Sequence, residues 1–193
     1  PKPVTLASGL DAITQVIEPY ISSRANPLTD ALCRAAIPRG LRALRKLMEG
    51  DTQDARDDMA FVSLTGGLAL ANAGLGAGHG LAGVIGGRVP TAPHGAVCGA
   101  LLPATLAANF AALPKDSPHA RRIAEIRVRA SEALGTANIS AWSRRHGLPT
   151  LSQMGIAPGD HAAIAAEAQS SSSMAANPVT LPVEVLHRIL AAS

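Results

Sequence analysis

Apolar residues recur at intervals of three and four along almost the whole chain, and this periodicity limits the fold more than any other feature. In the first long segment the spacing is carried by Leu10, Ile13, Ile17 and Ile21. It places these side chains on one face of a helix. No run of alternating β-branched residues occurs, so the sequence predicts no strand. Without a repeat or a linker, residues 1–193 are predicted to form a single all-helical domain.

Helix-start signals divide this pattern into separate helices. Ser8 and Asp11 stand in the S-x-x-D arrangement of a capping box, so the first helix is expected to begin at Ser8. Asn26 and Ser117 each precede a proline, which suits the first helical position. Pro38, followed by a glycine at position 40, is expected to bend or divide the second helix. Helices are expected over residues 8–22, 27–50, 52–73, 76–86, 93–113, 118–134, 137–146, 158–169 and 181–192, with a loop at 170–180.

Charge and aromatic content exclude one class of partner. The formal net charge is +3, which is too small to indicate a partner by itself. The densest basic cluster, residues 119–129, recurs at helical spacing and includes Glu125, so it predicts a solvated helix face. Binding to nucleic acid would need a stronger basic stripe or aromatic side chains for stacking. The sequence therefore predicts no nucleic-acid partner, and a core built from Ala, Leu, Ile and Val.

The two cysteines and the first residues bear on the compartment. Cys33 and Cys98 form no CxxC motif and have no metal-ligand spacing between them. This predicts a reduced cytoplasmic protein with small buried thiols. The stretch "PKPVTLASGLD" lacks the charged-then-apolar pattern of a signal peptide.

One segment is long and uncharged enough to raise the question of a membrane. Residues 59–87 carry no formal charge and exceed the roughly 20 residues that a spanning helix needs. Glycine is frequent in the segment, however, and Asn72 and His79 interrupt it without an aromatic belt or a basic flank at its ends. Two consecutive buried helices are expected here, and no membrane contact.

Residues 78–83 match the GxGxxG dinucleotide fingerprint letter by letter. Such a loop needs a strand before it and an acidic residue about 20 positions further on. The preceding residues are rich in alanine and glycine, and the next acidic residue is Asp116. The match is interpreted as chance.

His79 and His94 form the strongest candidate pair for chemistry, because imidazole is a common ligand of zinc and iron. Asp11 and Gln15 are four residues apart, so both side chains lie on one face of a helix. The residues alone leave alternatives open: a capping role for Asp11, a surface position for Gln15, and core histidines bonded to carbonyl groups. The histidines at 119, 146, 161 and 187 are expected at the surface. Chemistry unaided indicates an Asp/His metal site in a helical domain.

The order of these motifs resembles the C-terminal domain of the iron-containing (group III) alcohol dehydrogenases. The resemblance runs through "SGLDAITQVIEPYISSRANPLTDALC", "DMAFVSLTGGLALANAGLGAGHGLAGVIGG", "APHGAVCGALLP" and "SSSSMAANPVTLPVEVL", essentially the whole chain. It implies an all-α fold, the helical domain of the dehydroquinate synthase-like and iron-containing alcohol dehydrogenase type. Members of the family carry an N-terminal nucleotide-binding domain before this helical domain, so residues 1–193 are expected to be one part of a two-domain enzyme.

The resemblance also implies a ligand set for Fe2+ or Zn2+. The family's aspartate falls on Asp11, its helix partner on Gln15, and its two later histidines on His79 and His94. Gln15 is a departure, because the family has histidine there and an amide oxygen is a weaker ligand for a transition metal. Gly83 is another, because many members have a histidine implicated in proton transfer at that position. Weaker metal binding is expected, and an inherited proton relay is not.

The function implied is NAD(P)-dependent interconversion of an alcohol with an aldehyde or ketone by hydride transfer, with the metal as Lewis acid. This chain alone is expected to be inactive without a nucleotide-binding domain. One alternative is a metal-free, non-catalytic helical module for packing or oligomer contacts. Another is a maleylacetate reductase-like enzyme, ranked lower because that branch replaces the aspartate seen as Asp11. The substrate, the choice between NAD and NADP and homo-oligomer formation stay open. Glycines near His79 are expected to admit the nicotinamide, so Gly80→Leu is expected to end activity in a folded enzyme.

Overall fold

The structure, a computed structural model, describes residues 1–193 and is all-helical, without a strand. The predicted fold class is therefore confirmed. Nine α-helices follow one another along the chain: α1 (Lys2–Ile21), α2 (Pro27–Glu49), α3 (Gln53–Ala73), α4 (Ala77–Arg88), α5 (His94–Ala112), α6 (Pro118–Leu134), α7 (Ile139–Arg145), α8 (His161–Ala168) and α9 (Val183–Ala191). Three short 3-10 helices lie between them: η1 (Ser152–Met154), η2 (Pro158–Asp160) and η3 (Ser173–Ala176).

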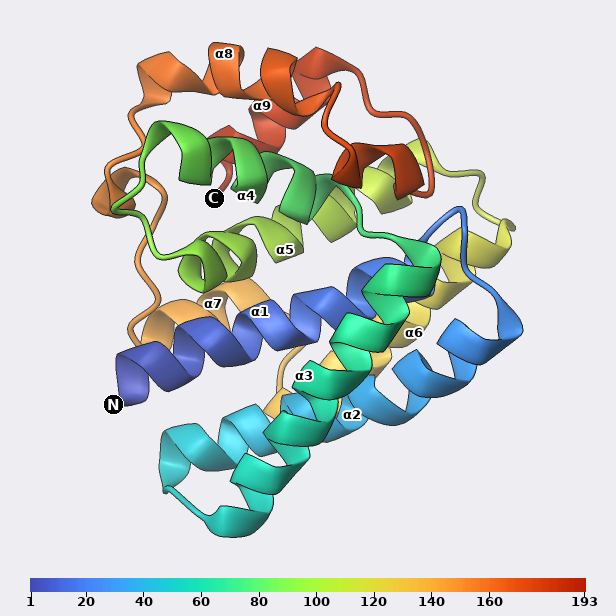
Figure 1. Cartoon of the computed structure of the whole chain (residues 1–193), viewed down its shortest axis with the longest axis vertical. Helices are drawn as coiled ribbons and strands as arrows, with labels where there is room; N and C mark the ends of the chain where they lie inside the picture. Colours follow the sequence, from blue (N-terminus) through green and yellow to red (C-terminus); the bar gives the residue numbers. More distant parts are fainter.

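Helix α1 connects two groups of helices. On one side it packs against α2 and α3, and on the other against α5, which in turn packs against α4 and α9. Figure 1 shows α1 in blue between α2 and α3 on one side and α4, α5 and α8 on the other. Side chains on α1 can therefore meet residues from α3, α4 and α5.

The core is almost entirely aliphatic, as the composition predicts. Tyr20 and Trp142 are the two buried aromatic side chains. The Tyr20 hydroxyl donates to Glu125 of α6 over 2.6 Å and accepts from Arg34 of α2 over 3.0 Å. These bonds connect α1, α2 and α6 at the C-terminal end of α1.

The start of α1 corrects the capping prediction. The helix begins at Lys2, with prolines in its first turn, where a missing N–H costs nothing. Ser8 therefore lies inside the helix, and its hydroxyl donates to the carbonyl of Val4 over 2.8 Å. The expected capping box of Ser8 with Asp11 is wrong, which removes the structural role considered for the Asp11 carboxylate.

Most other boundaries agree with the sequence. Asn26 caps α2 by accepting from two backbone N–H groups, and Ser117 caps α6. Pro38 lies inside α2, which is not divided there. The helix expected over 158–169 is η2 followed by α8, and the 170–180 loop contains η3.

Helix α6 is less solvated than its basic sequence suggests. The guanidinium of Arg122 donates to the carboxylate of Asp30 and to the backbone carbonyl of Tyr20. Only a fifth of each partner's side chain is exposed in this ion pair. The prediction of a solvated face is wrong for Arg122, which docks α6 onto α1 and α2.

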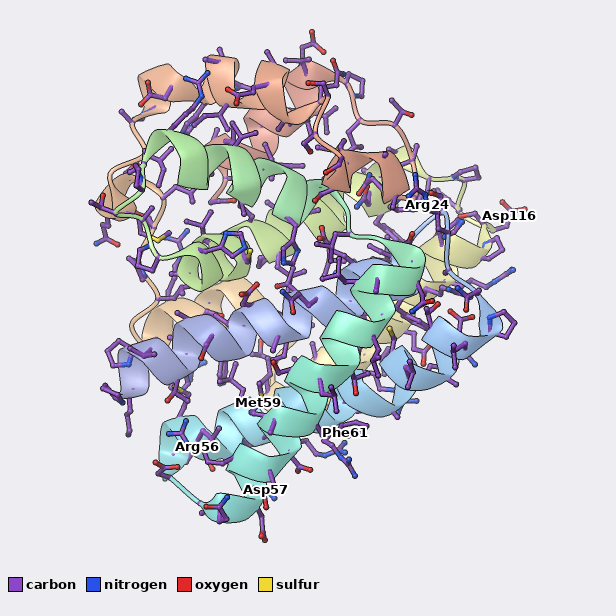
Figure 2. All side chains as sticks on the ribbon, viewed as in Figure 1. Arg24, Arg56, Asp57, Met59, Phe61 and Asp116 are labelled. Carbon is purple, nitrogen blue, oxygen red and sulfur yellow. The ribbon has the colours of Figure 1, made fainter.

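The uncharged segment folds as two helices that meet at 100°. The first half of α4 is buried as predicted, but α3 is buried on one face only, because Leu64 and Leu68 are 67% and 48% exposed. Near the middle of α3, Phe61 faces α2, where the guanidinium of Arg39 lies 4.5 Å from its ring centre (Figure 2). By length and composition alone α5 is apolar enough to cross a membrane, and half of that stretch is buried inside the fold.

Candidate metal centre

Four side chains from three helices converge where α1, α4 and α5 meet. Asp11 comes from α1, His79 from α4, and His94 and Cys98 from α5. One potential ligand atom of each lies within 4.8 Å of all the others. His79 Nε2 is 3.3 Å from Asp11 Oδ1, and His94 Nε2 is 3.5 Å from Cys98 Sγ. Three of the four ligands expected from the resemblance are thus close together.

The residues present fit a divalent metal ion. Bonds of about 2.0–2.3 Å in a tetrahedral site place ligand atoms roughly 3.3–3.8 Å apart, which matches the two distances above. Asp11 Oδ1 and His79 Nε2 are both buried and have no hydrogen-bond partner of good geometry. Buried polar atoms without a partner are costly, so this arrangement calls for a cation or a proton between them.

Glu18 holds His79 in place from the side opposite the cluster. Its side chain is 1% exposed, and Oε2 lies 2.7 Å from His79 Nδ1. A carboxylate at this distance requires a proton on Nδ1, so the free imidazole has Nε2 as its acceptor, directed at Asp11. The tautomer suited to metal binding is therefore set by α1 itself.

The same carboxylate satisfies the N-terminus of α4. Backbone N–H groups of Gly76, Gly78 and His79 donate to the two Glu18 oxygens over 3.1, 2.7 and 3.3 Å. These are the groups that a phosphate would need in a dinucleotide loop. They are occupied, and helix α3 precedes them where such a loop needs a strand. The structure agrees with the rejection of the GxGxxG match.

The charges of the cluster are strongly coupled. Burial lowers the pKa of His79, but the neighbouring Asp11, Cys98 and Glu18 outweigh burial and raise the pKa to about 12. Burial raises the pKa of Asp11, yet attraction to His79 leaves it below its ordinary value. Burial also raises the pKa of Cys98, to about 11, against the opposing effect of His79. Without a metal, a proton on His79 is the bridging cation.

Gln15 and Gly83 are the two departures from the family pattern, and Gly83 has no side chain to offer a metal. The Gln15 side chain packs beside Gly66 of α3, where a Cβ on the glycine would be 3.0 Å from Gln15 Cβ and 3.3 Å from its amide oxygen. Gly83 is exposed, with nothing within 4 Å of the place a Cβ would take.

Sequence reasoning missed Cys98, which stands four residues after His94 on α5. Helical spacing could have indicated it, because residues at this interval share a face. Glu18, seven residues after Asp11, is expected on the Asp11 side of the helix from its spacing, but the sequence gives it no role. His161 was expected at the surface, which is wrong, because it is 5% exposed with its ring 5.9 Å from that of His187.

The fold and the site together define a class of protein: an all-helical domain in which an aspartate and two histidines surround one candidate metal position. Residues 5–193 match the family described as Fe-containing alcohol dehydrogenase, C-terminal. The chain belongs to this family, a family of oxidoreductases. The expected resemblance is confirmed.

Named relatives agree with this assignment. The chain is 42% identical to 1,3-propanediol dehydrogenase of Citrobacter freundii over 60% of its own length and 30% of the relative. It is 33% identical to alcohol dehydrogenase 4 of Saccharomyces cerevisiae over 98% of its own length and 50% of the relative. A solved 1,3-propanediol oxidoreductase matches with a TM-score of 0.84 and 32% identity, over 99% of this chain and 52% of that one. The chain thus spans about half the length of the proteins it matches most fully.

Proposed function

We propose that this chain is the metal-binding half of an NAD(P)-dependent alcohol dehydrogenase that interconverts an alcohol with an aldehyde or ketone. The observation that supports this best is the meeting of Asp11, His79 and His94, with two buried ligand atoms left without hydrogen-bond partners. Residues 1–193 act as one domain in this proposal, because α1 packs against both groups of helices.

Asp11, His79 and His94 hold Fe2+ or Zn2+, and the family pattern names Gln15 as the fourth ligand. When bound, the metal supplies Lewis-acid stabilisation of developing negative charge on the substrate oxygen. Glu18 keeps His79 in the ligating tautomer. His94 is exposed, so the cluster is open on that side to a small molecule.

The structure offers space beside the cluster. A hollow of about 370 Å3 has Asp11 in its wall together with Pro93 and Gly95. Its lining is mostly apolar or backbone, which suits the carbon chain of a small alcohol. The nicotinamide cofactor is expected on a nucleotide-binding domain, since the relatives are about twice as long as this chain.

A metal-free helical module is the second candidate, and the departures at Gln15 and Gly83 favour it. Metal content distinguishes the two. The purified chain is reconstituted anaerobically with Fe2+ or with Zn2+, and bound metal is measured by elemental analysis. Variants His79→Ala and His94→Ala are run beside His187→Ala, which removes an exposed histidine outside the cluster.

Close to one metal per chain, lost in the first two variants and kept in the third, is the result expected. No metal in the parent chain under either condition would favour the helical module. Equal metal in all four proteins would place the metal elsewhere and overturn the proposed site.

A further inference from the structure

We propose that Cys98, as a thiolate, is the fourth metal ligand of this chain, in place of the amide of Gln15. The proposal rests on the metal centre proposed above and assigns it a specific donor set: one carboxylate, two imidazoles and one sulfur. Such a set favours Zn2+ over Fe2+, because thiolate is a soft ligand that zinc accepts readily.

The first turns of α5 carry two strong candidate ligands four residues apart, whereas on α1 the residue four positions after Asp11 is a glutamine. His94 and Cys98 are four residues apart on α5, so their side chains leave the helix on the same face. Cys98 Sγ lies 3.5 Å from His94 Nε2 and within 4.8 Å of the ligand atoms of Asp11 and His79. Helix α5 thus brings two candidate ligands at helical spacing to the cluster.

Close packing of α5 on α1 fixes the position of Cys98. A Cβ on Gly95 would lie 2.6 Å from the carbonyl oxygen of Ala7, and a Cβ on Gly99 would lie 2.7 Å from a methyl group of Leu10. Only glycine allows the two backbones to come this near, on both sides of Cys98. Cys98 is fully buried, so its sulfur is held toward the cluster and away from solvent.

The unpartnered atoms point to the same conclusion. His79 is 6% exposed, its Nε2 has no hydrogen-bond partner, and it faces the space that Asp11 and Cys98 also border. The Gln15 side chain packs beside Gly66 of α3. A neutral amide is also a weaker donor than a thiolate to a transition metal. On binding, the metal takes the place of the thiol proton, which is released to solvent.

Cobalt substitution tests this assignment without any measurement of activity. Co2+ replaces Zn2+ in such sites, and a cobalt–thiolate bond produces an intense near-ultraviolet charge-transfer band that nitrogen and oxygen ligands do not. The chain is titrated with Co2+ and its absorption spectrum recorded, followed by a competition titration with Zn2+. Variants Cys98→Ala, Cys98→Ser, Cys33→Ala and Gln15→Ala are compared, with circular dichroism as the control for folding.

The parent chain is expected to show the charge-transfer band at one Co2+ per chain. Cys98→Ala and Cys98→Ser lose the band and bind Zn2+ at least about 100-fold more weakly. That loss is larger than the roughly 10–100-fold typical when a residue that only hydrogen-bonds to a ligand is replaced. Cys33→Ala and Gln15→Ala keep the band. Cys33 is the matched control, because it is equally buried but lies on α2.

Stoichiometric cobalt without the band in the parent chain overturns the assignment of Cys98 and leaves the proposed metal centre standing. Loss of cobalt in Gln15→Ala, with the band unchanged in Cys98→Ala, does the same. No cobalt bound by the parent chain overturns both proposals. If the Cys98 variants lose their helical circular dichroism, the band in the parent chain and in Cys33→Ala decides, because the chain has only two cysteines.

Discussion

Glycine occurs in both halves of α4, but its surroundings differ between them. In the first half and just before it, a Cβ on Gly76 would lie 3.0 Å from Glu18 Oε1, and a Cβ on Gly78 would lie 2.9 Å from the same oxygen. In the second half, Gly83, Gly86 and Gly87 have nothing within 4 Å. A glycine-rich helix is therefore tightly fitted at one end and open at the other. Glycine in a sequence does not reveal which case applies, because the neighbour that decides lies on another helix.

Gly80 shows how this changes an expectation. A Cβ there would lie 3.0 Å from the Ser171 hydroxyl and 3.1 Å from the end of Met174. The glycine packs against the segment before α9, so we now expect Gly80→Leu to lower stability as well as activity. A leucine side chain in this buried position overpacks the fold, which destabilises it whatever becomes of the cofactor.

Among substitutions at the tightly packed end of α4, Glu18→Ala is expected to cause the largest loss of stability. The substitution leaves three backbone N–H groups at the start of α4 and His79 Nδ1 without their buried acceptor. We expect the free energy of unfolding to fall by about 3–5 kcal/mol, the range for removing one partner of a buried ion pair. Urea denaturation followed by circular dichroism measures this change.

Glu18→Gln and Glu184→Ala are the controls for that measurement. Glutamine keeps one acceptor oxygen and is expected to lose less stability than alanine. Glu184 is exposed in the first turn of α9, so its removal costs less than about 1 kcal/mol. A loss in Glu18→Ala no larger than that in Glu184→Ala would mean that α4 does not depend on this carboxylate.

The charge of His79 makes the tight half of α4 sensitive to pH. Its pKa is raised to about 12 in the metal-free fold, from an ordinary 6.5. The folded state therefore holds a proton that the unfolded state releases above pH 6.5, and stability falls as pH rises toward 12. One proton contributes at most about 1.4 kcal/mol per pH unit, so about 2 kcal/mol is expected between pH 7 and 9.

Thermal denaturation of the metal-free chain between pH 7 and 9 checks this slope against His79→Gln. That window lies below the raised pKa of Cys98, about 11, and below the ordinary value of a thiol near 9. The variant is expected to lose most of the slope. An equal slope in both proteins would contradict a proton held between His79 and its carboxylates.

Local signals in the sequence were sufficient for part of this molecule. Asn26 and Ser117 cap their helices as expected, since a cap involves only residues a few positions apart. Ser8 matched the same pattern and is not a cap, because the prolines before it start the helix earlier. Local patterns cannot decide between such candidates when a second start signal lies just upstream.

The site needed information that local patterns do not hold. Asp11, His79 and His94 are candidates by residue type, but only the resemblance joins them in one ligand set, since nothing near them in the sequence indicates that they meet. The roles of Cys98 and Glu18 emerge only when α1, α4 and α5 are packed together. Burial of His161 likewise depends on α9, whose His187 lies against it.

Gly78→Ala tests the tight end of α4 with the smallest change. The added Cβ would lie 2.9 Å from Glu18 Oε1, which accepts from Gly78, while Gly76 and His79 hold the other oxygen of the same carboxylate. Because the carboxylate cannot move aside without losing these bonds, we expect a loss of about 1–2 kcal/mol, as in other overpacked sites. Metal affinity should fall with it, since His79 depends on the same carboxylate. Unchanged stability and affinity would show that the carboxylate has room to shift.

Gly83→Ala, at the open end of the same helix, is expected to change stability in the opposite direction. A Cβ there meets nothing within 4 Å, and alanine loses less backbone entropy than glycine when a helix forms. The free energy of unfolding should rise by about 0.5–1 kcal/mol, which corresponds to roughly 1–4 °C in Tm for a chain of this size. Gly86→Ala, in equally open space, should behave alike, and metal content should stay unchanged in both. A lowered Tm in both variants would mean that the second half of α4 is covered by something outside these residues. Both ends of α4 would then be packed, each against a different neighbour, and the distinction between a packed end and an open end would fail.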